Sequence, residues 1–139
     1  MAEVYIDGGC RGNPGEGAFG FVIKDGTKEL QRYGERLGCC TNNVAEYRAF
    51  IGALKFLLKN GYGEGKGVTV YSDSELLVKQ MRGEYKVHSV KLKPLYADAV
   101  TLMRKMSDIE LIHISRKQNR LADWIVNRVL DGKEYQTDL

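Results

Sequence analysis

Cysteine, proline and tryptophan are scarce in this chain, with three, two and one copies in 139 residues. The cysteines Cys10, Cys39 and Cys40 are odd in number and two are adjacent, whereas the disulfide frameworks of secreted domains have even numbers at wider spacing. We therefore expect reduced thiols and a cytoplasmic protein. The two histidines, His88 and His113, stand alone and no Cys-x-x-Cys pair is present, which argues against a zinc site.

Long apolar runs and a strong net charge are also missing. No run approaches the roughly 20 apolar residues of a membrane span, and the start of the chain lacks a basic region followed by an apolar stretch. We expect a protein that is neither exported nor inserted in a membrane. The formal net charge is only +3, so charge alone is a weak argument for a nucleic-acid partner. The length and the 43% hydrophobic content fit a single domain over residues 1–139, ending in a polar tail over residues 130–139, of which residues 133–139 are expected to be loosely held.

The residue pattern predicts an antiparallel meander at the start of the chain. Residues 4–7 form a short apolar run that ends at Asp7, and the glycine-rich stretch 8–17 is expected to form a turn that ends this strand. Strands over 18–24 and 29–37 follow, joined at Asp25-Gly26, a dipeptide that accepts the positive φ of a hairpin turn.

Apolar residues then recur at helical spacing. Tyr47, Ile51 and Leu54 lie on one helical stripe, which predicts a helix that is capped near Thr41 and ends at Asn60-Gly61. Strand and helix patterns alternate after it, which predicts an α/β fold in which a mixed sheet has a parallel half and helices on its faces. The remaining elements are expected at 68–71 (strand), from 74 to Met81 (helix), 94–106 (helix), 109–114 (strand) and 120–130 (helix).

Four acids are predicted to lie at the ends of these elements. Asp7 and Asp73 follow strands, while Glu46 and Asp123 open helices. Strand ends and helix starts gather at one rim of an open α/β sheet, so the four carboxylates can converge there. A carboxylate cluster repels itself unless cations lie within it, and ligation by oxygen alone favours Mg²⁺ or Mn²⁺, a pair of which can cleave a phosphodiester. The alternative is that the two aspartates after strands cap turns and that the two acids on helices complement helix dipoles.

Four segments resemble the motifs of type 1 ribonuclease H (ribonuclease HI) and occur in the family's order. They are YIDGGCRGNPG at 5–15, TNNVAEY at 41–47, YSDS at 71–74 and NRLAD at 119–123. The resemblance extends from residue 4 to about residue 130. It implies a ribonuclease H-like fold with a five-stranded mixed sheet, in which three antiparallel strands are followed by parallel ones and helices lie on both faces. It also implies hydrolysis of the RNA strand of an RNA·DNA hybrid with two Mg²⁺ ions, which Mn²⁺ can replace, to give 3′-hydroxyl and 5′-phosphate ends.

The resemblance also assigns roles to individual residues. Asp7 would bridge the two metal ions, Glu46 and Asp73 would hold the side of the attacking water, and Asp123 would hold the leaving-group side. Small amide side chains and close backbone approach suit recognition of the 2′-hydroxyl, which both donates and accepts hydrogen bonds. The residues matched to substrate binding are Gly8, Cys10, Gly12, Asn13, Asn42, Asn43 and Glu75 on the RNA side, and Thr41 at a phosphate of the DNA strand.

The chain departs from many relatives in two places. The loop before the last helix has no histidine, and we hypothesise that Arg116 holds the scissile or leaving phosphate in its place; the alternative is that Arg116 and Lys117 form a solvated basic edge. A basic, tryptophan-rich protrusion is also missing, so we expect weaker and more salt-sensitive binding of the hybrid. Trp124, the single tryptophan, is expected to pack rather than to flank the site.

Two rival functions are consistent with the same pattern. One is another nuclease of the same fold, and the other is a non-catalytic nucleic-acid-binding module. The presence of all four acids favours an enzyme over the binding module, and the 2′-hydroxyl motif favours the hybrid nuclease over other nucleases. We expect a monomer whose partner is the RNA·DNA hybrid, with no membrane and no protein partner.

Overall fold

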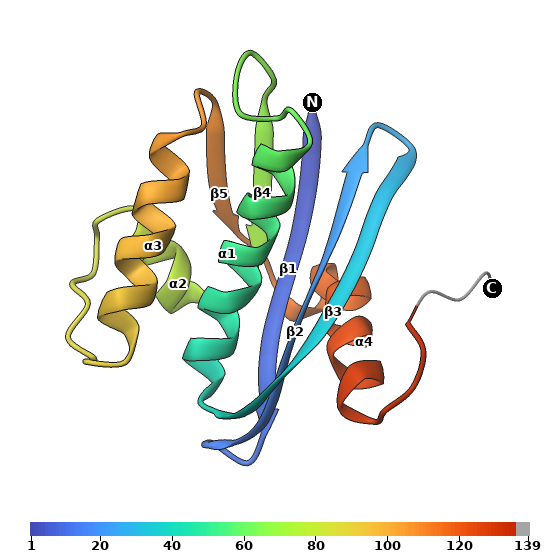
Figure 1. Cartoon of the computed structure of the whole chain (residues 1–139), viewed down its shortest axis with the longest axis vertical. Helices are drawn as coiled ribbons and strands as arrows, with labels where there is room; N and C mark the ends of the chain where they lie inside the picture. The colour runs from blue at the N-terminus through green and yellow to red at the C-terminus, as the bar shows by residue number, and fades with distance from the viewer. Residues whose placement is uncertain (136–139) are drawn as a thin grey trace.

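A computed structural model describes residues 1–135; residues 136–139 of the predicted tail lie outside the described residues. The described residues form one five-stranded sheet in the order β3-β2-β1-β4-β5, with helices beside it (Figure 1). In chain order, the elements are β1 (Ala2–Arg11), β2 (Gly15–Asp25), β3 (Lys28–Cys40), α1 (Asn42–Lys59), β4 (Val68–Ser72), α2 (Glu75–Met81), α3 (Leu92–Arg104), β5 (Ile109–His113), the 3-10 helix η1 (Arg116–Asn119) and α4 (Arg120–Leu130).

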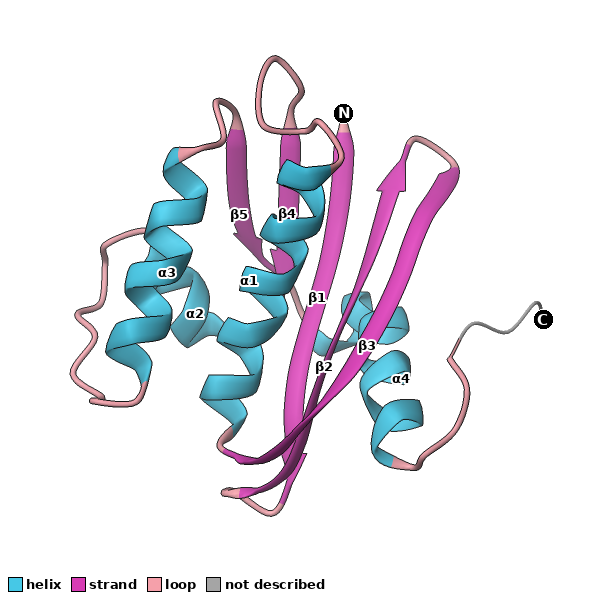
Figure 2. Ribbon diagram, in the orientation of Figure 1, coloured by secondary structure: helices cyan, strands magenta, loops and turns pink. Residues whose placement is uncertain are grey.

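The sheet has the mixed topology that the resemblance implied. Strands β1, β2 and β3 pair antiparallel in sequence order, and β4 joins β1 in parallel before β5 joins β4 in parallel. Helices lie on both faces, with α1, α2 and α3 on one and α4 on the other (Figure 2). The fold class predicted from the sequence is therefore confirmed.

The predicted end of the first strand at Asp7 is wrong. Strand β1 continues to Arg11, and its residues after Asp7 pair with β2 up to the contact of Arg11 with Glu16. The low strand propensity of the glycines in this stretch is outweighed by the complete ladder of backbone pairs with β2. Only Gly12, whose φ is +86°, and the two residues after it form the turn.

The loop of the hairpin between β2 and β3 lies one residue later in the chain than predicted. Asp25 pairs with Lys28, so Asp25 ends β2 and the two-residue loop is Gly26-Thr27. Gly26 takes the positive φ, at +63°. Both strands are longer than predicted because their ends pair with each other, and the ends of β2 also pair with β1.

The helices were predicted more closely than the strands. Thr41 caps α1 by accepting a hydrogen bond from the backbone N–H of Val44, and the stripe of Tyr47, Ile51 and Leu54 is buried against the sheet. Helix α3 begins two residues before the predicted start at 94, because the Ser89 carbonyl already accepts hydrogen bonds at its first turn. Helix α4 has the predicted bounds.

The sheet separates two apolar clusters. The larger one lies under α1, α2 and α3, and the smaller one lies under α4. Trp124 packs against this smaller cluster, as predicted, with the guanidinium groups of Arg32 and Arg128 over its ring. Helix α4 ends at Leu130, and within the described part of the predicted tail the Tyr135 hydroxyl donates a hydrogen bond to the Gly34 carbonyl on β3. None of the helices in residues 1–135 is long and apolar enough to cross a membrane.

Candidate active site

The four predicted acids come from four different elements. Asp7 lies in the middle of β1 and Glu46 near the start of α1, while Asp73 directly follows β4 and Asp123 lies in the first turn of α4. Asp7, Glu46 and Asp73 each place one carboxylate oxygen within 4.8 Å of the others. Asp123 hydrogen-bonds with the side chain of Asp7. The sheet and its helices therefore bring all four carboxylates together.

The approach of α1 to β1 depends on a glycine next to the first acid. A Cβ atom at Gly8 would lie 2.3 Å from the Ala45 carbonyl carbon and 2.5 Å from the Glu46 nitrogen, so no other residue fits without moving the helix. The backbone amide of Gly8 also hydrogen-bonds with both Asp7 and Glu46, and this opposes part of the rise that burial causes in the pKa of each carboxyl. Gly8 thus fixes the distance between the carboxylates of β1 and α1.

Burial and mutual repulsion make this cluster unstable as a set of bare anions. Burial, with the charges of Asp73 and Asp123 beside it, raises the pKa of the Asp7 carboxyl to about 8. Burial also raises the pKa of Glu46 well above its ordinary value, and the charges of Asp7 and Asp73 add to this effect. For Asp73, burial raises the pKa, while a hydrogen bond from Asn119 and the charge of Arg116 lower it.

The residues present fit a hard divalent cation. The donor set consists of carboxylate oxygens alone, which Mg²⁺ and Mn²⁺ prefer over softer metals. The Oε1 atom of Glu46 is buried and has no hydrogen-bond partner. A buried charged oxygen without a partner is costly, and a cation within the cluster would remove that cost and the repulsion together.

The four carboxylates line one hollow of about 500 Å³. Arg116 enters it from η1, where its positive charge offsets part of the rise that burial causes in the pKa values of Glu46 and Asp73. Its neighbour Lys117 is exposed and does not line the hollow. The alternative in which Arg116 and Lys117 form one solvated basic edge therefore does not describe their positions, because only Arg116 lines the hollow.

The residues matched to substrate binding fall into two groups. Gly8, Cys10 and Asn42 line the hollow beside the carboxylates. The others lie outside its lining, and Glu75 is an exposed residue of α2 with its Oε1 atom 3.8 Å from the Nζ atom of Lys79. Those outside are Gly12, Asn13, Thr41, Asn43 and Glu75.

A hydrogen-bond network joins the turn after β1 to the start of α1. The Oδ1 atom of Asn42 accepts hydrogen bonds from the Cys10 backbone N–H, at 3.0 Å, and from the Cys10 thiol, at 3.2 Å. The Oδ1 atom of Asn13 accepts one from the Asn42 backbone N–H at 3.1 Å. Asn42 is not the helix cap, since Thr41 has that position. Its side chain instead holds β1 in place relative to α1.

Sequence reasoning missed the part that Asn119 has in this site. Asn119 is 1% exposed, and its Nδ2 atom donates a hydrogen bond to the Ile6 carbonyl at 2.8 Å. It also hydrogen-bonds with Asp73, and its Oδ1 atom has no partner. The available signal was a polar residue at the start of an amphipathic helix, four positions before Asp123. Asn127 was also missed; it lines the hollow and donates to the Asp123 carbonyl at 3.0 Å.

Comparison with known proteins gives the relationship of the chain. Residues 5–129 match the family described as reverse transcriptase-like. A bifunctional protein of Mycobacterium tuberculosis is 38% identical over 131 residues, which cover 93% of this chain and 35% of the relative. Ribonuclease HI of Halobacterium salinarum is 34% identical over 130 residues, which cover 93% of this chain and 64% of the relative. The chain thus spans only about a third of the mycobacterial protein.

Solved structures agree over nearly the whole length of both chains. LC11-RNase H1, in complex with an RNA/DNA hybrid, is 39% identical with a TM-score of 0.90, covering 95% of this chain and 98% of that one. RNase H1 of the halophilic archaeon Halobacterium salinarum is 32% identical with a TM-score of 0.88, covering 94% and 98%. The match in sequence, fold and length shows that this chain belongs to the ribonuclease H1 family.

Proposed function

We propose that the chain is an endoribonuclease that hydrolyses the RNA strand of RNA·DNA hybrids with two divalent metal ions and leaves 3′-hydroxyl and 5′-phosphate ends. The observation that carries this proposal is the meeting of Asp7, Glu46, Asp73 and Asp123 in one hollow. A relative with 39% identity has been solved with an RNA/DNA hybrid bound, which supports the same class of substrate here.

The four carboxylates are the proposed metal ligands. Asp7 has carboxylate neighbours on both sides and would hold both ions; Glu46 and Asp73 would hold one of them, and Asp123 the other. When bound, Mg²⁺ or Mn²⁺ ions supply the activation of a water and the stabilisation of the leaving oxygen. The protein orients the ligands in advance, since Gly8 hydrogen-bonds with Asp7 and Glu46 while Asn119 hydrogen-bonds with Asp73.

We place the RNA strand along the end of β1 and the start of α1. The backbone of Gly8, Cys10 and Gly12 and the side chains of Asn13 and Asn42 would contact its 2′-hydroxyls, because that group needs both donors and acceptors at short range. Outside the hollow, Asn43 and Glu75 would also contact RNA, and Thr41 would contact a DNA phosphate. These residues are exposed or half-buried, as contact with substrate requires.

Arg116 is the proposed phosphate ligand of the site. It lines the hollow with the four acids, and a guanidinium binds phosphate oxygens through paired hydrogen bonds. In this position it would hold the scissile or leaving phosphate next to the carboxylates. All the proposed groups come from one chain, so we propose that the enzyme acts as a monomer.

Cleavage of labelled duplexes tests the proposal. RNA·DNA, RNA·RNA and DNA·DNA duplexes of one sequence would be incubated with Mg²⁺, Mn²⁺ or EDTA, and the product ends would be mapped by ligation and phosphatase treatment. We expect cleavage of the RNA strand of the hybrid with either metal and none with EDTA. Cleavage that persists in EDTA, products with 2′,3′-cyclic phosphate ends, or binding without cleavage would refute the proposal.

A further inference from the structure

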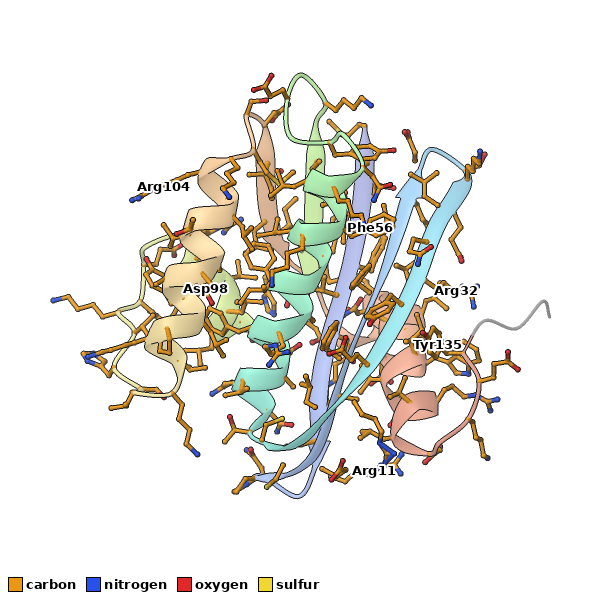
Figure 3. All side chains as sticks on the ribbon, in the orientation of Figure 1. Arg11, Arg32, Phe56, Asp98, Arg104 and Tyr135 are labelled. Carbon is orange, nitrogen blue, oxygen red and sulfur yellow. The ribbon has the colours of Figure 1, made fainter. Side chains whose placement is uncertain are left out.

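A second hollow lies away from the carboxylates, between α1 and the strands β2 and β3. In Figure 1, α1 lies in front of the sheet beside β1, and the hairpin end of β2 and β3 extends to the right of α1 with no helix in front of it. The hollow has a volume of about 340 Å³ and shares no lining residue with the carboxylate site. Phe56 lies between α1 and the β2–β3 hairpin in Figure 3. The residues that line the hollow are Phe19, Phe21, Tyr33, Glu35, Arg48, Ile51, Gly52, Lys55 and Phe56.

The floor of this hollow is aromatic. The ring centroid of Phe21 lies 5.5 Å from that of Tyr33 and 6.1 Å from that of Phe56, and Phe19 lies 6.0 Å from Tyr33. These separations are those of favourable aromatic pairs, so the rings hold one another in place. A further aromatic ring or a branched apolar side chain could join the group without a change in its arrangement.

A glycine in the middle of α1 keeps the hollow open. A Cβ atom at Gly52 would lie 3.0 Å from the Cε1 atom of Phe19, so a larger side chain there would fill the space. Glycine inside a helix is less favourable than alanine because its backbone loses more conformational freedom. The space over the rings therefore exists at some cost in helix stability.

The rim of the hollow is positively charged on balance. Its single acid, Glu35, accepts a hydrogen bond from the Tyr33 hydroxyl at 2.7 Å and lies 4.0 Å from the NH2 nitrogen of Arg48. Lys55 is exposed and forms no ion pair within residues 1–135. Arg48 and Lys55 lie nearly two turns apart on α1 and border the same hollow. An anionic group at the rim would meet both cations.

The floor favours a hydrocarbon side chain over a nucleobase. Its only polar side-chain atom is the Tyr33 hydroxyl, which already donates to Glu35. A nucleobase on this floor would lose hydrogen bonds with water and gain none from the floor, whereas a phenyl or branched aliphatic group would lose none. A volume of about 340 Å³ is also at the lower end for ligand pockets, which suits one or two side chains.

We propose that this hollow is a docking site for an acidic segment of a partner protein. The segment would insert one aromatic or large apolar side chain over Phe19, Phe21 and Phe56 and would place its carboxylates at Arg48 and Lys55. The proposal does not depend on the hydrolytic activity, because no residue of the carboxylate site takes part.

Fluorescence anisotropy with the labelled peptide Glu-Asp-Phe-Asp-Glu tests this proposal on the full chain. We expect saturable binding that weakens about tenfold in Lys55→Glu, as reversal of a charge beside a carboxylate does. The matched control is Lys59→Glu, one turn further on the same helix and outside the lining, which should keep its affinity. A peptide with Ala in place of Phe should lose most of its binding. Hybrid cleavage by Lys55→Glu should equal that of the unmodified chain.

Three results would overturn the docking site. Equal binding of the Phe and Ala peptides would show that the aromatic floor takes no part. An equal loss in Lys55→Glu and Lys59→Glu would show a general charge effect. Displacement of the peptide by a single-stranded oligothymidylate whose own binding is lost in Lys55→Glu would assign the site to nucleic acid instead.

Discussion

Replacement of Asp7 by Asn should have opposite effects on two properties of the carboxylate cluster. It should raise the free energy of unfolding without metal, and it should lower the rate of hybrid cleavage. The pKa of Asp7 rises from 3.8 to about 8 in the folded chain. Between these values the folded form holds a proton that the unfolded form has lost, so without metal the free energy of unfolding should fall as pH rises from about 4 to about 8. Asp7→Asn removes one charge from the cluster and should reduce this fall.

The size of the effect follows from the pKa. A carboxyl whose pKa rises from 3.8 to about 8 costs the folded state up to about 6 kcal/mol once it is ionised in both forms. The proton is shared with the other carboxylates, so we expect Asp7→Asn to regain about 1–2 kcal/mol at pH 8 in EDTA. The same change should lower hybrid cleavage three to four decades, which corresponds to about 4–5.5 kcal/mol of barrier.

Urea unfolding at pH 5 and pH 8 in EDTA, with parallel cleavage assays in Mg²⁺, measures both effects. Asp98→Asn, an exposed change on α3, is the matched control and should move neither quantity. Our reasoning on the cluster would be refuted by equal stability of the unmodified chain at the two pH values, or by no gain in Asp7→Asn at pH 8. Retained cleavage in Asp7→Asn would refute its assignment as a metal ligand.

Three other substitutions test the surroundings of the cluster. Arg116→Ala should lower kcat at least about tenfold, through loss of a charged hydrogen bond to phosphate, while Lys117→Ala should leave kcat unchanged. Equal kcat values for these two variants would refute the proposed role of Arg116 as a phosphate ligand. Gly8→Ala should lower the free energy of unfolding by more than about 2 kcal/mol because its Cβ meets the backbone of α1, whereas Gly9→Ala, with no neighbour closer than 3.9 Å, should change it little in the same urea titration. Asn119→Ala should cost about 1–3 kcal/mol of stability and also lower kcat, and a stability loss with unchanged kcat would restrict Asn119 to a structural role.

The helices were predictable because their signals are local. The stripe on α1 and the one on α4 depend only on spacing along the chain, and Thr41 caps a helix through contacts within its own turn. The end of β1 was not predictable in this way. Its residues after Asp7 are extended because they pair with β2, which is a contact that glycine-rich sequence does not indicate.

The same distinction between local sequence signals and contacts of distant segments applies to the candidate site. The convergence of Asp7, Glu46, Asp73 and Asp123 was predicted from the ends of elements and from family resemblance, although Asp7 lies inside β1 and not at its end. The contributions of Asn119 and Asn127 depend on where η1 and α4 lie relative to β1, and local sequence does not contain that information. The different positions of Arg116 and Lys117 in η1 likewise became visible only in the structure.

The extension of β1 past Asp7 has a consequence for how the enzyme would choose its phosphodiester. The proposed metal ligand and the proposed RNA contacts at Gly8 and Cys10 lie on one continuous strand, and each step along it advances about 3.3 Å. If these proposed roles hold, the separation between sugar recognition and bond cleavage would be set by three steps of strand backbone, about 10 Å, that pair with β2. An enzyme built in this way would recognise the sugar and align the phosphodiester to be cut in a single placement of the duplex, without a separate closing motion.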